Sequence, residues 1–351
     1  MQNPDPGAKL AYFEKWVDPI ALDILAKHPS IQVLRLDYDA PVEISLARMQ
    51  EAAGYQIAPR GELREPWFGN GDLLRCCPHL LAITSTGSGY DMVDVEACTR
   101  AGVIVCNQTG SNSIAVAEHA LGLTLALLHK FGISDRAMRK YEGIDRFDYA
   151  GTDANGKTIG LVGIGQIGTR MAAFCKALGM TVLAYDPHLT SAEISARGAA
   201  PTDWEQLLAS SDVISVHCPR TEETFGMLNA TAFAQMKPGA YFVSTARGGI
   251  HDEKDLHFAL ASGHLAGAGL DVFLQEPPSK AHPLLSLDNV IATPHSAGLS
   301  REAVRAMASY AAQQWVDIFT GRVPPRLVNP EAWPLYSAKF SRQFGFAPDE
   351  L

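Results

Sequence analysis

The chain has 351 residues, of which 47% are hydrophobic and 19% charged, and its formal net charge is −9 with a pI of about 5.6. This length exceeds what one ordinary core accommodates and predicts two domains, and the balance of apolar and charged residues is that of a soluble globular protein. An acidic chain without a basic cluster has little to attract a phosphate backbone, so we expect no nucleic-acid partner.

The sequence gives no indication of secretion, membrane insertion or metal binding. The first residues, MQNPDPGAK, have no apolar core and no cleavage signal, so we expect no secretion sequence. No uncharged apolar run approaches the roughly 20 residues that span a bilayer. The cysteines form no CxxC pair and no Cys/His spacing that suits zinc, which predicts a reducing, cytoplasmic compartment, no metal site and buried thiols at Cys76, Cys77, Cys98, Cys106, Cys175 and Cys218.

Short apolar runs alternate with helical patterns along the first third of the chain. We expect strands at AYF, IQVLRL, YQIA, LLAIT and VIVC, near residues 11, 31, 55, 80 and 103. Helix-like stretches such as ALDILAKH and VDVEACTRAG separate them. This alternation predicts a parallel sheet with helices on both faces. An apolar helix over residues 115–129 then leads into the next series.

The second series begins at Thr158 and contains TIGLVG, TVLAYD, DVISVHC, AYFVST, AGAGLDV and NVIAT. Six strands with intervening helices match a complete dinucleotide-binding sheet. A long amphipathic helix is expected over 301–319, and the tail after Pro330 shows little pattern. We expect the chain to leave the first domain near Asn112 and to re-enter it near Ala297. The predicted domains are therefore 1–112 with 297–351, which is discontinuous, and 113–296.

A G-x-G-x-x-G pattern follows the first strand of the second series, in IGLVGIGQIGTRM. Gly163 permits the tight turn, Gly165 lets the backbone approach a pyrophosphate, and Gly168 lets the following helix pack against the strand. The helix N-terminus, which includes Gln166 and Ile167, presents free N–H groups to the phosphates. Asp186 ends the next strand, at about the spacing expected for the ribose-binding acid, and no arginine follows it, which favours NAD over NADP.

Three further stretches follow later strands, where such sheets place their ligands. They are VSTARGG with Arg247, GLDVFLQEPP with Asp271 and Glu276, and ATPHSAG with His295. Alone, each is compatible with a surface arginine, a turn glutamate or a core histidine. Together they supply an anion-binding guanidinium, a carboxylate and an imidazole at one edge of the sheet.

The sequence resembles the D-isomer-specific 2-hydroxyacid dehydrogenases over about residues 80–330. The motifs that carry the resemblance are TGSGYDMVD, NSIAVAEHALGLTLAL, GKTIGLVGIGQIG, VHCPRTEETFGMLN, MKPGAYFVSTARGG, GAGLDVFLQEPP and NVIATPHSAG. The resemblance implies an α/β fold of two doubly wound parallel-sheet domains. It further implies that a Rossmann NAD-binding domain is inserted in a flavodoxin-like substrate domain, with the active site expected in the cleft between them.

The resemblance implies that Arg247, Glu276 and His295 are the catalytic set for hydride transfer between NAD and a small 2-keto or 2-hydroxy acid. His295 supplies the proton for the substrate oxygen near neutral pH. Glu276, if hydrogen-bonded to the ring, fixes its tautomer and favours the imidazolium. Arg247 binds the substrate carboxylate and polarises the carbonyl oxygen.

Other residues take their expected roles from the same resemblance. Gly87, Ser88 and Gly89 match the loop whose N–H groups hold the substrate carboxylate, although a plain turn fits them too. Trp67 and Phe68, in an unusually aromatic stretch, either reach over the substrate or pack in the core. The family is usually dimeric, and helix 115–129 is a candidate for the interface or for the domain's own core. Cofactor contacts are implied at His217, Cys218, Pro219, Thr245, Ala246, Arg247, Asp271, His295 and Gly298.

Other functions on the same fold remain open. A nucleotide-sensing interaction protein, like the C-terminal-binding-protein corepressors, fits the same motifs, although no long disordered tail or partner motif is evident. A formate dehydrogenase fits poorly, because that branch has Gln where Glu276 stands. A phosphoglycerate dehydrogenase without its regulatory domain is also compatible. The substrate itself is not determined by these residues.

Overall fold

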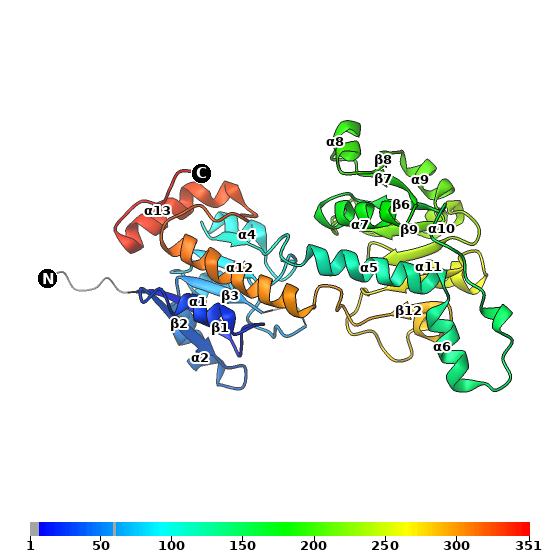
Figure 1. Ribbon diagram of the computed structural model, residues 1–351. Helices are drawn as coiled ribbons and strands as arrows, with labels where there is room; N and C mark the ends of the chain where they lie inside the picture. The colour runs from blue at the N-terminus through cyan, green and yellow to red at the C-terminus, as the bar shows by residue number, and fades with distance from the viewer. Residues whose placement is uncertain (1–6, 59–60) are drawn as a thin grey trace. The chain divides into compact units, whose positions relative to one another are not determined.

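The computed structural model describes residues 7–58 and 61–351, so most of the N-terminal stretch considered above lies outside the described residues. The chain forms two compact units. The first comprises the chain up to Asn112 together with Ser300–Leu351, and the second comprises Ser113–Leu299. In Figure 1 the blue and red ends of the chain share the first unit, whereas the green and yellow segments form the second.

Among the described residues, the first unit holds a 5-stranded parallel sheet in the order β2-β1-β3-β4-β5. This order is the flavodoxin-like one, as expected. Helices cover both faces: α1 (Ile20–Leu25) and α12 (Arg301–Phe319) on one, and α2 (Val42–Gln50), α3 (Gly71–Cys76) and α4 (Val95–Arg100) on the other. The strands are β1 (Ala8–Phe13), β2 (Ile31–Leu36), β3 (Gly54–Ile57), β4 (Ala82–Ser85) and β5 (Ile104–Cys106).

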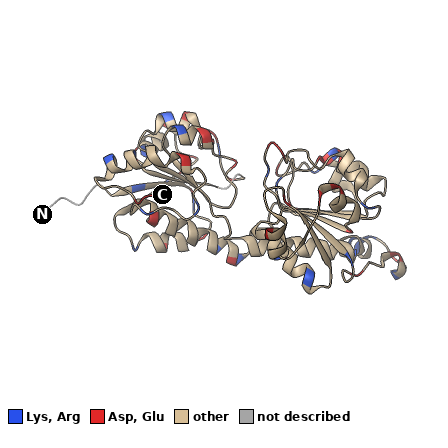
Figure 2. Ribbon diagram, turned by 90° about the horizontal axis from the view of Figure 1, so that it is seen from above, with Lys and Arg blue, Asp and Glu red and all other residues tan. Residues whose placement is uncertain are grey.

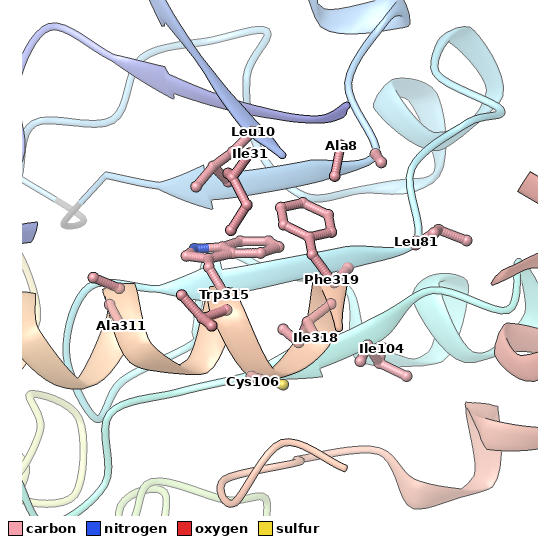
Figure 3. Close-up of a cluster of buried hydrophobic side chains, with 14 of the residues drawn as sticks. Ala8, Leu10, Ile31, Leu81, Ile104, Cys106, Ala311, Trp315, Ile318 and Phe319 are labelled. Atoms are coloured by element: carbon pink, nitrogen blue, oxygen red, sulfur yellow. The ribbon is translucent and has the colours of Figure 1, made fainter. Parts of the chain in front are cut away.

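The core under α12 is built around Trp315, whose ring is fully buried and faces the strands in Figure 3. Its Nε1 donates a hydrogen bond to Gln56 Oε1 at 2.8 Å, so the polar edge of the ring is satisfied. A Cβ at Gly54 would lie 2.4 Å from Trp315 Cζ3, so only glycine leaves room for the indole on β3. Phe319 stacks on Trp315 with ring centroids 5.4 Å apart.

The expectation of a tail with little pattern is wrong. Residues after Asn329 form the short η3 (Pro330–Ala332) and the 12-residue helix α13 (Trp333–Phe344). Trp333, Tyr336 and Phe340 lie on one face of α13 and are buried in the same core as Trp315. Their spacing of three and four residues is a helical period, and Pro334 occupies the first turn, where proline is tolerated.

The aromatic stretch before α3 packs in the core of the first unit. Trp67 is buried, its ring lies 4.7 Å from that of Phe13, and its carbonyl oxygen accepts a hydrogen bond from the Tyr55 hydroxyl at 3.0 Å. Phe68 is half-buried against the same cluster. Of the two interpretations left open for these side chains, the structure supports packing.

The second unit, all of whose residues the structure describes, holds a 7-stranded parallel sheet in the order β12-β11-β10-β9-β6-β7-β8. The expected fold class is thus confirmed, with one addition: β8 is a two-residue edge strand that we did not expect. The strands are β6 (Thr158–Val162), β7 (Thr181–Tyr185), β8 (Ala200–Pro201), β9 (Val213–Val216), β10 (Tyr241–Ser244), β11 (Gly267–Leu270) and β12 (Val290–Ala292).

Helices cover both faces of this sheet as well. Side chains of α5 (Ser113–Leu128), α7 (Gln166–Ala177) and α8 (Ser191–Ala196) pack on one face. Those of α9 (Trp204–Ser210), α10 (Ala230–Gln235) and α11 (Glu253–Ala261) pack on the other. Two short elements complete the unit, η1 (Arg146–Tyr149) and η2 (Pro283–Ser286).

The apolar helix α5 belongs mainly to the core of its own unit, because it packs on α7, β10 and β11. It is followed by α6 (Phe131–Lys140), which we did not predict. Within residues 7–58 and 61–351 no single helix is long and apolar enough to cross a membrane. Only α5 and α6 taken together pass that test of length and composition, and they are bent by 59° where they meet.

The surface carries both signs of charge, and several exposed apolar side chains lie close together in the sequence. In Figure 2, Lys and Arg (blue) and Asp and Glu (red) are interspersed over the helices and loops of both units. Phe131, Met138, Tyr141 and Phe147 are all more than half exposed, and all belong to α6, η1 and the segment between them. Among the six cysteines, Cys76 is exposed rather than buried as expected, and Cys218 is half-buried.

Candidate active site

The glycine-rich turn between β6 and α7 has the geometry that the sequence predicts. Gly163 has a φ of +88°, and a Cβ there would lie 2.8 Å from the backbone nitrogen of Cys218. A Cβ at Gly168 would lie 2.5 Å from the carbonyl oxygen of Gly163, which keeps α7 close to the strand. A Cβ at Gly165 would have no atom within 4 Å, so this part of the turn is open to a ligand.

Asp186 lies directly after β7 and faces this turn. Its Oδ2 accepts a hydrogen bond from Ile164 N at 3.1 Å, and its Oδ1 accepts one from His188 N at 3.2 Å. The side chain borders a cavity of about 540 Å³ that Leu189, Ile194 and Thr202 also line. Arg197, which the sequence did not single out, donates from Nη1 to the carbonyl oxygen of Ile164 at 2.8 Å. A carboxylate and a guanidinium therefore both contact the residue between the first two glycines.

The segment after β9 provides uncharged groups. Burial lowers the pKa of His217 to about 4, so the ring is neutral at pH 7. Its Nε2 pairs with Ser215 Oγ at 3.0 Å, whereas its buried Nδ1 has no hydrogen-bond partner among the described residues. Burial, with a smaller contribution from Asp186, raises the pKa of the Cys218 thiol to about 11, which keeps it protonated. Pro219 follows and is exposed.

The end of β10 leads into Thr245, Ala246 and Arg247. The hydroxyl of Thr245 is buried without a hydrogen-bond partner among the described residues. Arg247 is half-buried and donates from Nη1 to the carbonyl oxygen of Ala246 at 2.7 Å. A Cβ at Gly248 would lie 1.9 Å from the carbonyl oxygen of Phe273, so the loop that carries Arg247 rests directly on the loop that follows β11.

His295 and Glu276 form a close pair. The ring Nδ1 lies 2.6 Å from Glu276 Oε2, and the exposed fractions of the two side chains are 43% and 25%. The second carboxylate oxygen, Oε1, accepts a hydrogen bond from Phe273 N at 3.0 Å. Since one ring nitrogen is bonded to the carboxylate, Nε2 is the nitrogen left for exchange of a proton with another molecule.

The backbone of His295 has a φ of 52°, in the left-handed region that non-glycine residues rarely occupy. Such a conformation costs of order 1–3 kcal/mol and persists only where neighbours hold it. Asp271 provides that support from the end of β11, where it is 1% exposed. Its Oδ1 accepts hydrogen bonds from the Thr293 hydroxyl at 2.6 Å and Ser296 N at 2.8 Å, and its Oδ2 accepts one from Ala297 N at 2.9 Å.

Two residues that the sequence analysis missed, His119 and Thr293, complete this support. His119 Nε2 lies 3.0 Å from Thr293 Oγ1 and 3.8 Å from Asp271 Oδ1. Because the Thr293 hydroxyl donates its proton to Asp271, it accepts one from the His119 ring. Asp271, which we expected to contact the cofactor, therefore also fixes the loop of His295. Its role toward a cofactor stays a prediction, as does that of the half-buried Gly298 that follows.

The Gly87–Ser88–Gly89 loop belongs to the first unit and follows β4. Its carbonyl oxygens are used by the chain: that of Gly87 accepts from Gln108 N at 2.9 Å, and that of Ser88 accepts from Asn107 Nδ2 at 3.0 Å. No backbone N–H of residues 87–89 donates a hydrogen bond within the described part of the chain. The loop thus has the free donors that an anion-binding nest requires.

The comparisons with known proteins agree on one family. Residues 121–297 match the family model described as D-isomer specific 2-hydroxyacid dehydrogenase, NAD binding domain. The second unit is therefore an NAD-binding domain. Over 260 residues the chain is 41% identical to the D-3-phosphoglycerate dehydrogenase of Archaeoglobus fulgidus, which covers 74% of this chain and 49% of that protein.

Two further relatives match nearly along their whole length. The glyoxylate reductase of Aeropyrum pernix is 35% identical over 322 residues, which cover 90% of this chain and 94% of that protein. The D-lactate dehydrogenase of Aquifex aeolicus, solved in complex with NAD and lactic acid, superposes with a TM-score of 0.77 at 25% identity and covers 91% of this chain and 98% of its own. By contrast, the chain spans about half the length, 49%, of the phosphoglycerate dehydrogenase named above.

Proposed function

We propose that this chain, which belongs to the D-isomer-specific 2-hydroxyacid dehydrogenase family, interconverts a small D-2-hydroxyacid and its 2-keto acid with NAD(H). The observation that carries the proposal is the His295–Glu276 pair, with Nδ1 and Oε2 2.6 Å apart, on an NAD-binding domain. An imidazole held in this way can exchange a proton at its other nitrogen.

In the reduction, His295 Nε2 donates a proton to the carbonyl oxygen as that oxygen becomes a hydroxyl, and in the oxidation it takes the proton back. Glu276 holds the Nδ1 side, which fixes the tautomer and stabilises the imidazolium before the proton leaves. Both side chains are partly exposed, so the acid can be reprotonated from water between turnovers. Bound NAD(H) supplies the hydride to the carbonyl carbon or accepts it in the reverse direction.

Arg247 is proposed to bind the substrate carboxylate and to polarise the carbonyl oxygen. A guanidinium presents several N–H donors in a fixed plane, so it can contact both groups of a 2-keto acid at once. The Gly87–Ser88–Gly89 loop is proposed to bind a substrate carboxylate through its backbone N–H groups. A substrate with a second negatively charged group would need a further cationic side chain, and the proposed set of site residues includes none besides Arg247 and His295.

The described residues fit a dinucleotide cofactor. The open space at Gly165 and the start of α7 suit its pyrophosphate, with Gln166 and Ile167 contributing N–H groups. Asp186 suits the ribose hydroxyls, and the buried unpaired atoms of His217 and Thr245 suit groups further along the molecule. Cys218, Pro219, Ala246, Asp271 and Gly298 are proposed to line the same site.

The test is a screen of glyoxylate, hydroxypyruvate and pyruvate with NADH and with NADPH, and of D-3-phosphoglycerate with NAD. We expect NADH-dependent turnover of at least one 2-keto acid. His295→Asn should lower kcat by about 10²–10⁴-fold, as loss of a general acid does, while NADH affinity measured by fluorescence is retained. Tight NADH binding without turnover of any substrate would support the nucleotide-sensing interpretation instead, and full activity of His295→Asn would refute the proton-transfer role.

We also propose that the protein is a cytoplasmic homodimer that associates through the second unit. The support is the group of exposed side chains Phe131, Met138, Tyr141 and Phe147, since exposed apolar clusters mark interaction sites. Free cysteines, including the exposed Cys76, suit a reducing compartment. Sedimentation of the wild type and of a Phe131→Glu variant tests the association; a variant that sediments like the wild type would exclude α6 from the interface.

A further inference from the structure

A second histidine–glutamate pair, Glu253 and His282, lies behind the candidate site. Glu253 is the first residue of α11, and His282 precedes η2. Glu253 Oε2 lies 3.0 Å from His282 Nε2, and the side chains are only 18% and 19% exposed. Neither residue belongs to the motifs considered above, and neither is part of the proposed catalytic set.

The protonation of this pair follows from its contacts. His282 Nδ1 accepts a hydrogen bond from Leu284 N at 3.3 Å, which caps η2. A nitrogen that accepts carries no proton, so the proton of the neutral ring is on Nε2 and is donated to Glu253. Glu253 is thus a carboxylate that receives two donors, since its Oε1 accepts from Leu274 N at 2.6 Å. Its place in the first turn of α11 further favours a negative charge.

Both members of the pair hold the turn that carries Glu276. Glu253 holds the backbone of Leu274, and the His282 ring packs edge-on against Phe273, with centroids 5.4 Å apart at 75°. Phe273 N is the donor to Glu276 Oε1, at 3.0 Å. Residues 274–277 lie at the surface, whereas Phe273 before them is buried. The loop of Arg247 rests on the same turn, because Gly248 lies against the Phe273 carbonyl.

We propose that Glu253 and His282 are positioning residues that hold the 273–276 turn, and with it the Glu276 carboxylate, beside His295. This inference rests on the proposed function, in which Glu276 orients His295. Neither residue is proposed to contact the substrate or the cofactor. Both act on the position of the Glu276 carboxylate through their contacts with Phe273 and Leu274.

The test uses two conservative variants of the full chain. Glu253→Gln keeps an oxygen for Leu274 N but loses the acceptor for His282. His282→Asn keeps a side-chain oxygen to cap η2 but cannot reach Glu253, so it serves if the first variant does not fold. We expect each to lower kcat by about 10-fold, below the ~10²-fold that a 1 Å misplacement can cost, with NADH affinity unchanged. The matched control is Asp255→Asn on the same helix, whose carboxylate accepts Ala230 N at 2.7 Å and should leave kcat unaltered.

A readout independent of turnover is the NMR signal of the His295 ring nitrogens in the chain without cofactor, assigned with His295→Asn, because it reports the contact of Nδ1 with Glu276 Oε2. Glu276→Gln should change this signal, since the carboxylate that faces Nδ1 is lost. Glu253→Gln should change it in the same direction by less, and should add nothing in a Glu276→Gln background. A wild-type ring signal and kcat in both Glu253→Gln and His282→Asn would overturn the positioning role, as would equal effects with and without Glu276.

The two proposals fail in different ways. If Glu276→Gln and His295→Asn keep wild-type turnover, the proton-transfer role that the proposed function gives this pair is wrong, whatever the Glu253 variants do. If those two variants lose activity while Glu253→Gln and His282→Asn behave like Asp255→Asn, only the positioning role is wrong.

Discussion

The two units share a parallel α/β architecture but differ at the carboxyl ends of their strands. In the first unit, β4 ends in the uncharged loop Gly87–Ser88–Gly89. In the second, the ends of β7, β10, β11 and β12 lead to Asp186, Arg247, Glu276 and His295. The first unit instead concentrates aromatic side chains in its core, where Trp315, Tyr336 and Phe340 are fully buried. We therefore predict that substitutions in the first core alter stability, whereas those at the second set of strand ends alter activity.

The largest expected effect on stability comes from Trp315→Ala. Loss of a buried aromatic side chain typically costs about 3–5 kcal/mol, and here Gln56 also loses the hydrogen bond from the indole. We expect the free energy of unfolding in urea to fall by that amount while NADH affinity of the folded protein stays the same. A parallel loss of NADH affinity would show that the core of the first unit also affects cofactor binding, which would contradict the prediction.

His251, a buried histidine of the second unit, can be compared with His295 at the end of β12. His251 is 1% exposed, packs edge-on against Phe242, and neither ring nitrogen has a hydrogen-bond partner among the described residues. Burial lowers the pKa of His251 from 6.5 to about 4. His295 is the same residue type in the opposite setting, partly exposed and paired.

The pKa of His251 predicts the pH dependence of stability. Between pH 6.5 and 4 the unfolded chain binds a proton at this residue and the folded chain does not, so stability falls as the pH falls through this range. The loss is at most about 3 kcal/mol for a shift of this size. Urea unfolding at several pH values should show a shallower dependence in His251→Phe, whereas the exposed control His188→Gln should follow the wild type. Parallel curves for His251→Phe and wild type would contradict the assignment.

Asp271→Asn tests whether the loop of His295 needs its buried anchor. An amide has one oxygen where the carboxylate has two, so Ser296 N or Ala297 N would face an NH₂ group. We expect kcat to fall by about 10²-fold, as a misplacement of about 1 Å does. Asp212→Asn is the matched control, because Asp212 accepts Thr158 N at 2.9 Å at the opposite end of the sheet. Equal kcat for the two variants would show that the anchor is dispensable.

The sequence was sufficient to predict the fold class, the glycine turn and the residues now found as the His295–Glu276 pair. The fold class and the glycine turn depend on local patterns, namely strand and helix periods and glycine spacing, whereas the pair was implied by the resemblance to a known family. The helix α13 also had a local signal, the spacing of Trp333, Tyr336 and Phe340, which was overlooked. No local pattern in the sequence predicts the contact of His119 with Thr293, because 174 residues separate the two. Such support depends on tertiary packing, which no single stretch of sequence encodes.

The smallest expected effect concerns the choice of cofactor at Asp186. Removing the carboxylate in Asp186→Ala takes away the acceptor for the ribose hydroxyls, and we expect NADH affinity to fall by about 10-fold, or about 1.4 kcal/mol. NADPH should lose less or gain, because the negative charge that repels a 2′-phosphate is gone while Arg197, which contacts Ile164, remains.

The control for this variant is Asp203→Asn, since Asp203 lines the same cavity and caps α9 by accepting Gln206 N at 2.7 Å. Fluorescence titrations with both cofactors give the ratio of affinities for each protein. If Asp186→Ala and Asp203→Asn change that ratio equally, discrimination comes from the general acidity of the cavity and not from the residue that faces the glycine turn. A change in the ratio confined to Asp186→Ala would show that the discrimination between NADH and NADPH depends on the carboxylate at the end of β7.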